Sequence, residues 1–173
     1  MLSRSIHLGG LDFNDAIRDY LRDTFAVVTD DATVEEMKTK NGSAVLPLED
    51  KSYYFTGRGL DDGLQKELEI KASEIYTALG RPLVKILDLA KTVLRETPPE
   101  IAADIMENGI YLTGGTSQLK GLDQLLQQEL DVPVNLVGNP SEVVARGAGI
   151  ALSQREKLMS LIQGTQHIYR RRF

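Results

Sequence analysis

Gly114, Gly115 and Thr116 follow a short apolar run at residues 110–112. This pattern is typical of a buried strand that ends in a tight turn before a helix. Backbone N–H groups in such a turn can come close to a ligand, because glycine has no side chain in the way. A helix that starts here would direct the positive end of its dipole at the same place, which favours an anion. The alternative is a tight connection without a ligand, since no P-loop Gly-Lys-Ser/Thr follows.

Glu35 and Lys38 are a second set of residues whose side chains could contact a ligand. A carboxylate can accept a hydrogen bond from a ligand hydroxyl, and an ammonium group supplies positive charge beside a phosphate. The alternative is an ordinary helix pair three residues apart, which contributes only about 0.2–0.5 kcal/mol. The two residues alone do not decide between a binding pair and a structural pair.

The elements that position these residues follow from the spacing of apolar side chains. Amphipathic helices are predicted over residues 11–28, where Asp12 is the expected cap, and over residues 118–130. Another helix is predicted from about Asp31 to Asn41, with acidic residues in its first turn. An aromatic cluster and several glycines in residues 43–69 predict two or three strands with turns.

The remaining segments alternate between helix and strand. Strands are predicted at residues 3–8, 110–113 and 132–137, and the second of these is expected to be deeply buried between helices. Gly80 and Pro82 predict a break between a helix at residues 75–79 and a new helix that starts at Pro82. A last helix is expected over residues 141–158 with its apolar side towards the core. The alternation indicates an α/β layer with parallel strands.

Composition excludes several classes of function. The chain has 173 residues, a net charge of −5 and 42% apolar residues, which argues against a general nucleic-acid binder. It has no cysteine and only two histidines, His7 and His167, far apart in the sequence. We therefore expect no histidine-based metal site and no Ser-His-Asp catalytic arrangement within the chain. The absence of disulfide chemistry suits the cytoplasm.

Four segments together resemble one known family, the bacterial actin-like MreB proteins. They are Gly9-Gly-Leu-Asp-Phe13 with Ala16-Ile17 and Tyr20; Val34-Glu-Glu-Met-Lys38 through Gly42-Ser-Ala44; Pro98-Pro-Glu-Ile-Ala102 with Gly109-Ile-Tyr-Leu-Thr-Gly-Gly115; and residues 119–137 with Pro140 and Val144-Ala-Arg-Gly147. The segments occur in the family's order and with natural spacing up to about Leu152. The match corresponds to the second half of an MreB protein.

The resemblance implies an α/β fold: a partial actin-like (ribonuclease H-like) lobe with a smaller α+β subdomain. Residues 1–72 would form an initial strand and the smaller helical and β subdomain, and residues 73–173 the α/β core with a basic C-terminal tail. Gly114, Gly115 and Thr116 would lie beside the ribose and inner phosphate of ATP. Glu35 and Lys38 would flank the adenine and ribose. Thr116 stands where the family usually has a third glycine.

The resemblance also implies what this chain cannot do alone. The chain begins where the family's second lobe is entered, so we expect it to lack the phosphate loops and the acidic residues that position water and Mg²⁺. ATP binding should be weak or absent in the isolated chain, Mg²⁺ should bind only if the first lobe is supplied, and no hydrolysis is expected. The expected function is that of a truncated cytoskeletal protein of cell shape, which carries the adenine side of an ATP site.

Two alternatives remain open. The first is an interaction module that binds no nucleotide and binds or caps filaments of a full-length relative. The second is one lobe of a sugar kinase or chaperone ATPase, against which the helix-rich residues 13–42 argue. The expected partners are a second copy of the chain or a full-length MreB-like filament, and not nucleic acid. The expected location is the cytoplasm. The basic residues 166–173 could contact the inner face of the membrane, and the alternative is a solvated chain end.

Overall fold

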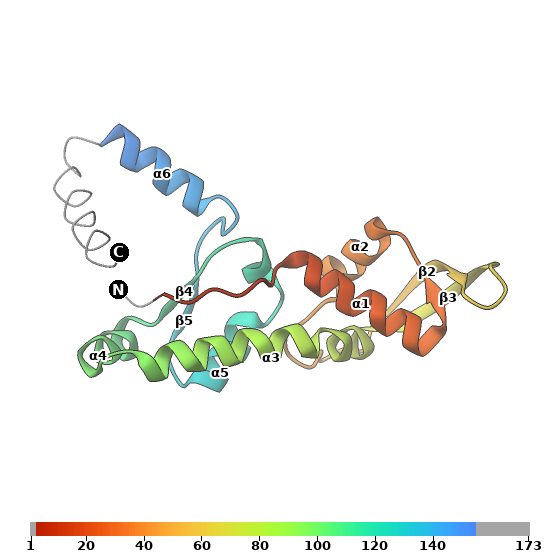
Figure 1. Ribbon diagram of the computed structural model, residues 1–173, viewed down its shortest axis with the longest axis horizontal. Coiled ribbons are helices and arrows are strands. Elements are labelled where there is room, and N and C mark those ends of the chain that lie inside the picture. Colours follow the sequence, from red (N-terminus) through yellow and green to blue (C-terminus); the bar gives the residue numbers. More distant parts are fainter. Residues whose placement is uncertain (1–2, 155–173) are drawn as a thin grey trace, which may run out of the picture.

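The computed structural model describes residues 3–154, which form an elongated α/β molecule (Figure 1). In chain order the elements are α1 (Gly10–Phe25), β1 (Val27–Val28), α2 (Asp31–Asn41), β2 (Ser52–Gly59), β3 (Gln65–Lys71), α3 (Ala72–Glu96), α4 (Pro99–Asn108), β4 (Ile110–Leu112), the 3-10 helix η1 (Gly115–Gln118), α5 (Leu122–Leu130), β5 (Val134–Leu136) and α6 (Val143–Ser153). None of the helices in this part of the chain is long and apolar enough to cross a membrane. The predicted basic tail at residues 166–173 lies outside the described residues.

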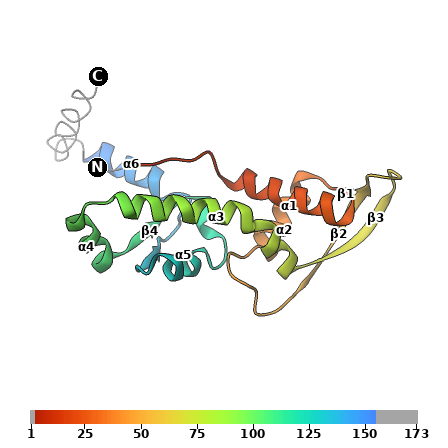
Figure 2. The same ribbon diagram turned by 60° about the horizontal axis from the view of Figure 1, so that its bottom comes forward.

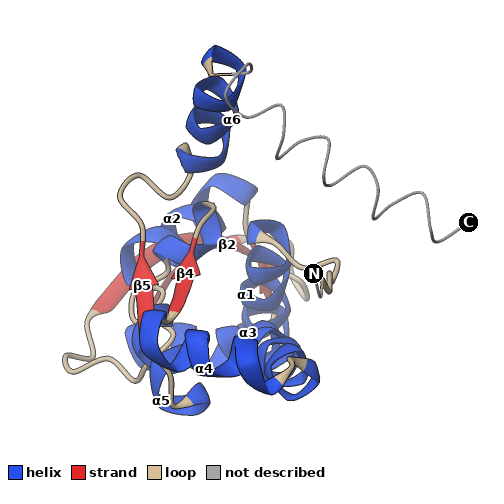
Figure 3. Ribbon diagram, turned by 90° about the vertical axis from the view of Figure 1, so that its left-hand side faces the viewer, coloured by secondary structure: helices blue, strands red, loops and turns tan. Residues whose placement is uncertain are grey.

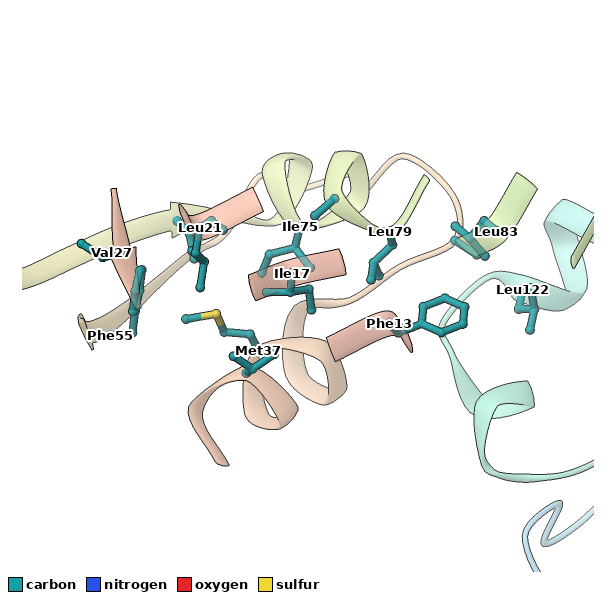
Figure 4. Packing of buried hydrophobic residues seen from close by; sticks show 14 of the residues in the cluster. Phe13, Ile17, Leu21, Val27, Met37, Phe55, Ile75, Leu79, Leu83 and Leu122 are labelled. Carbon is teal, nitrogen blue, oxygen red and sulfur yellow. The ribbon is translucent and has the colours of Figure 1, made fainter. Parts of the chain in front are cut away.

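Helices α1, α2 and α3 enclose the centre of the core (Figure 4). Ile17 of α1 and Ile75 and Leu79 of α3 are fully buried, as the helical spacing of apolar residues predicts. Helix α2 begins after Asp30, whose side chain accepts a hydrogen bond from the Thr33 N–H. Asp12 lies in the first turn of α1 rather than at the cap, where its carboxylate accepts from the Gly9 N–H at 2.6 Å.

Strands β1, β2 and β3 form an antiparallel sheet at one end of the molecule (Figure 2). The prediction of two or three strands in residues 43–69 is confirmed by the β2–β3 hairpin. On this hairpin Phe55 and Ile70 point into the core, whereas Tyr54 is exposed. The alternation of buried and exposed residues fixes the face that each strand turns towards the helices.

Strands β4 and β5 form a separate parallel pair with α5 packed against it. The expectation that residues 110–113 are deeply buried is wrong. Ile110 and Leu112 are only partly buried, and Tyr111 is 64% exposed. A sheet of two strands covered by helices on one side leaves the other face open, which is the physical reason for the difference.

Helix α3 runs without a break through Gly80 and Pro82, so the predicted break is wrong. Pro82 cannot donate a backbone hydrogen bond within the helix. The buried stripe on α3 nevertheless continues across it, from Leu79 through Pro82 itself to Leu83. Burial of this face outweighs the local propensity to break, because tertiary packing supplies most of the stability of a helix in a protein.

Residues 3–8 form no strand, contrary to the prediction. They run as an extended segment, and Arg4 forms an ion pair with Glu96 at the end of α3. Within residues 3–154 no strand pairs with this segment, because the parallel sheet consists of β4 and β5 alone. The isolated alternation of apolar and polar residues is not enough to make a strand without a neighbour to supply its hydrogen bonds.

Helix α6 stands away from the rest of the described residues (Figure 3). The expectation that its apolar side faces the core is wrong, since no residue of α6 is buried. Val144 is 70% exposed and Leu152 is 75% exposed. The apolar residues predict the helix correctly, but not what it packs against. The predicted end of this helix at residue 158 lies outside the described residues.

A short backbone contact joins the segment after α2 to the segment before α5. Ser43 and Lys120 form an isolated parallel bridge, in which the Ala44 N–H donates to the Lys120 carbonyl at 2.7 Å. Gly121 follows with a φ of +74°, and a Cβ atom there would lie 2.6 Å from Cγ2 of Val45. Only glycine fits this position, because both the backbone conformation and the space exclude a side chain.

We expect Gly121→Ala to destabilise the protein. The left-handed conformation costs about 1–2 kcal/mol for a residue with a Cβ, and overpacking against Val45 costs about 1–3 kcal/mol more. Gly80→Ala is the matched control, because a Cβ at Gly80 meets nothing within 4 Å and the helix favours alanine. Urea unfolding should show a loss for the first variant and no loss for the second. Equal stabilities would contradict the role given to the bridge.

Candidate functional site

A cavity of about 770 Å³ lies where α1, α2 and the loop from η1 to α5 meet. Four of the five residues predicted from the sequence line it: Glu35 and Lys38 from α2, and Gly115 and Thr116 from η1. Gly114 precedes η1 and is not on the wall of the cavity. The structure thus brings together residues that lie about 80 positions apart in the sequence.

The glycine turn has a different geometry from the one expected. A 3-10 helix of four residues, η1, follows the glycines, and α5 begins only at Leu122. The expectation that an α-helix starts at once is therefore wrong, and the dipole of α5 does not begin at the turn. Gly114 has a φ of +87°, and its N–H donates to the Pro140 carbonyl at 2.8 Å, so this N–H is already used within the protein.

The space beside Gly115 is open. A Cβ atom built at Gly115 meets nothing within 4 Å, although this residue lines the cavity. The turn is held from behind by Ser117, which is buried and whose hydroxyl donates to the Gly114 carbonyl at 2.6 Å. A fixed turn with open space in front of it allows a ligand to approach the backbone closely.

Glu35 and Lys38 form an ion pair that is held by α1. The Lys38 Nζ donates to Glu35 Oε2 at 2.8 Å and to the Gly10 carbonyl at 3.1 Å. The Lys38 side chain is only 14% exposed, whereas that of Glu35 is 50% exposed. The hydrogen bond from Lys38, and then one from Asn14, hold the pKa of Glu35 below its ordinary value. Glu35 is therefore an ionised acceptor at the cavity.

Sequence reasoning gave no ligand role to the other residues of the cavity wall, which are Gly10, Leu11, Phe13, Thr39, Lys40, Gly42, Gln118, Leu119 and Lys120. Lys40 forms an ion pair with Glu36, and Lys120 presents a further cation. Three lysines and one glutamate on the wall make the cavity favour an anionic ligand. The position of Lys120, two residues beyond η1, was the signal that could have identified it.

The described residues on the cavity wall offer groups that can bind a ligand. Glu35 can accept from a hydroxyl, and the lysines can attract a phosphate. Residues 3–154 contain no group of three acidic, histidine or cysteine side chains that could hold a metal ion.

The comparison with protein families decides the family. The model of the MreB/Mbl protein family matches residues 1–160, which is most of the chain. The chain belongs to the MreB/Mbl family. It is 38% identical over 150 residues to the cell shape-determining protein MreB of Escherichia coli (strain K12), covering 87% of this chain and 43% of that protein. It is 35% identical over 156 residues to the cell shape-determining protein Mbl of Bacillus subtilis (strain 168), covering 90% of this chain and 47% of that protein.

Solved structures show the same fold. MreB5 of Spiroplasma citri bound to ADP superimposes with a TM-score of 0.87 at 32% identity, covering 92% of this chain and 49% of that one. The MamK double helical filament has a TM-score of 0.64 at 19% identity, covering 79% of this chain and 42% of that one, and shows the fold alone. The MreB/Mbl chain described here is thus a partial actin-like domain that spans about half the length of its relatives.

The resemblance seen in the sequence is confirmed for the family and for the fold class. The division at residues 72 and 73 stays a prediction. Helix α3 begins at Ala72, packs against α1 with its first half and contacts α5, and the buried residues form one continuous cluster.

Proposed function

We propose that this chain is the part of an MreB-like cytoskeletal protein that holds the adenine side of an ATP or ADP site. The observation that carries the proposal is the shared cavity of Glu35, Lys38, Gly115 and Thr116. MreB5 of Spiroplasma citri, with which the chain shares its fold, was solved bound to ADP and to AMPPNP. The chain alone is not an ATPase under this proposal, and Mg²⁺ binds only when the outer phosphates are enclosed by further polypeptide.

The contacts of the site support binding of a nucleoside phosphate. Glu35 is ionised and offers an acceptor for a ribose hydroxyl. Lys38 holds Glu35 while its charge contributes to the positive character of the wall. The open space at Gly115 allows the ribose and inner phosphate to approach the turn. Gly114 supports the turn from outside the cavity, through its bond to Pro140.

A titration with ADP tests this function. The isotope-labelled chain is titrated with ADP to millimolar concentration while backbone amide signals are recorded. We expect weak, saturable shifts at the cavity, centred on Lys38, Gly115 and Thr116. GDP at the same concentration is the control for recognition of the base. Shifts spread over the surface, or none at millimolar ADP, would contradict a nucleotide site.

Gly115→Val should remove any nucleotide binding and leave the fold intact. The new side chain enters open space in the cavity, so it displaces the ligand rather than a protein atom. Gly114→Val is the contrasting variant. The φ of +87° at Gly114 strains any side chain there, so this substitution acts on the backbone of the turn rather than on the space of the cavity. Glu35→Ala should weaken binding less, since it removes one acceptor only. Unchanged binding in Gly115→Val, with native circular dichroism, would show that the turn is only a connection.

A second candidate function rests on helix α6. Val144, Ile150 and Leu152 are exposed on it, which favours a contact with another polypeptide. The chain would then be an interaction module that binds or caps filaments of a full-length relative without using nucleotide. Sedimentation with filaments of a full-length MreB tests this function. A capping module should shorten or solubilise the filaments even when its own cavity holds no nucleotide.

Assembly and location complete the proposal. The exposed apolar residues Val144, Ile150 and Leu152 of α6 support self-association or incorporation into an MreB-like filament. We place the protein in the cytoplasm, with the basic residues 166–173 contacting the inner face of the membrane. Flotation with anionic vesicles tests the membrane contact, since a chain ending at residue 165 should lose it.

A further inference from the structure

Asn14 is a buried polar residue that neither the sequence patterns nor the resemblance singled out. It lies on α1 between Phe13 and the turn that contains Ile17, and it is only 3% exposed. Its Nδ2 donates to Glu35 Oε2 at 2.8 Å. Its Oδ1 is fully buried and has no hydrogen-bond partner among the described residues.

The half-satisfied amide shows why core packing alone does not account for this residue. A buried acceptor without a partner lowers stability, so an apolar side chain would suit this position better if filling space were its only role. The opposite orientation of the amide would set Oδ1 against the Glu35 carboxylate and would be repulsive. The contact between Nδ2 and Glu35 therefore determines how Asn14 is placed.

Two donors converge on the same oxygen of Glu35. Asn14 Nδ2 and Lys38 Nζ both lie 2.8 Å from Oε2. The other oxygen, Oε1, accepts no hydrogen bond from the described residues, and the Glu35 side chain is half exposed at the cavity. The two bonds favour the charged carboxylate and restrict its rotation, which leaves Oε1 as the free acceptor.

We propose that Asn14 is a positioning residue of the cavity, which holds the charged Glu35 carboxylate in an orientation that lets Oε1 accept a hydrogen bond from a ligand hydroxyl. The effect on Glu35 stands by itself. Its consequence for ligand binding rests on the nucleotide site proposed above. Asn14 acts through Glu35 and does not line the cavity.

The segments packed near Glu35 carry further charged groups: Asp31, Glu36, Lys38 and Lys40 on its own helix α2, Asp15 and Arg18 on α1, and Lys120 in the loop between η1 and α5. Arg18 engages Asp31 at 2.6 Å, and Lys40 engages Glu36, so these acids are each paired with a cation. Lys38 and Asn14 are the groups that bond Glu35 directly. Loss of Asn14 should therefore be visible in the titration of Glu35 itself.

The test measures the pKa of Glu35 by carbon-13 NMR of the side-chain carboxyl in the 173-residue chain, with Glu35→Gln to identify the signal. We expect Asn14→Leu to raise the pKa of Glu35, because a bond that favours the charged form is lost. The charged carboxylate then disappears at a higher pH as the pH is lowered. Tyr20→Phe is the matched control, since it removes a hydrogen bond from α1 to another carboxylate, that of Glu74.

A second measurement needs no variant of α1. In the unaltered chain the side-chain amide signal of Asn14 should shift with the titration of Glu35, and it should still do so in Lys38→Met. An amide signal that does not follow Glu35, or a pKa of Glu35 that is unchanged in a folded Asn14→Leu, would overturn the proposal and leave Asn14 a packing residue.

Measuring ADP binding at two pH values separates the role of Asn14 from the existence of the nucleotide site. If the unaltered chain binds ADP, Asn14→Leu should weaken that binding at least several-fold more near the pKa of Glu35 than at neutral pH. If the unaltered chain binds no ADP, the proposed function fails, while the titration of Glu35 still decides the role of Asn14. Equal weakening at both pH values would show that Asn14 does not act through the charge of Glu35.

Discussion

Phe13→Ala should lower the free energy of unfolding by about 3–5 kcal/mol, as for other large side chains removed from a core. Phe13 is 1% exposed and lies in the core between the α3 side chains and Leu122 of α5 (Figure 4). Its ring packs between helix α3 and helix α5, which follows the glycine turn, so its loss leaves a void between these two helices. Small domains are stable by only about 5–15 kcal/mol, so the variant should unfold at much lower urea concentration.

Leu11→Ala is the matched control for this change. Leu11 is on the same helix two residues earlier and is 74% exposed, so the truncation should alter the stability by less than about 0.5 kcal/mol. Urea unfolding followed by circular dichroism measures both variants. A similar, small effect of the two substitutions would mean that α1 does not connect the helical layer to α5 in solution.

The helices and the hairpin could be predicted from the sequence because local signals determine them. The apolar spacing on α1 and the acidic first turn of α2 are properties of neighbouring residues. The same holds for the aromatic and β-branched residues of β2 and β3. Tertiary packing decided the segments that were predicted wrongly. Pro82 remains in a helix because the buried face of α3 continues through it from Leu79 to Leu83, and residues 3–8 form no strand because no described strand pairs with them.

The site shows the same division. The types and spacing of Glu35, Lys38, Gly115 and Thr116 suggested a ligand, and the resemblance joined them into one site. Asn14 could not be predicted, because its contact with Glu35 joins two helices and carries no local pattern. The 3-10 geometry of η1 was also not predicted, because its four residues resemble the start of the next helix in the sequence.

The exposed apolar surfaces predict that the chain associates with further polypeptide. Helix α6 has no buried residue, and Tyr111 and Leu136 on the small sheet are also exposed. The relatives are about twice as long as the match. We infer that further polypeptide, equivalent to the N-terminal half of a relative, covers these surfaces and encloses the phosphates. In its absence, we expect the chain to self-associate through them.

We therefore expect nucleotide affinity to depend on that polypeptide. The chain alone should bind ATP at best in the millimolar range, about −4 kcal/mol, and should not hydrolyse it. Co-expression with the N-terminal half of Escherichia coli MreB should raise the affinity at least 100-fold, which is about 2.7 kcal/mol. The gain comes from charge-assisted hydrogen bonds to the outer phosphates and from Mg²⁺, which the described residues do not supply. Calorimetry on the purified chain and on the complex measures it.

Two variants separate association from nucleotide binding in this experiment. Val144→Asp places a charge on the exposed face of α6 without touching the core, so it should prevent association and with it the gain in affinity. Gly115→Val should leave association intact and abolish only the nucleotide binding of the complex, since its new side chain fills open space in the cavity. Micromolar binding of ATP by the chain alone would contradict the proposal that the outer phosphates need a second lobe. If the chain stays monomeric at high concentration and does not bind the N-terminal half of Escherichia coli MreB, the role given to α6 is contradicted.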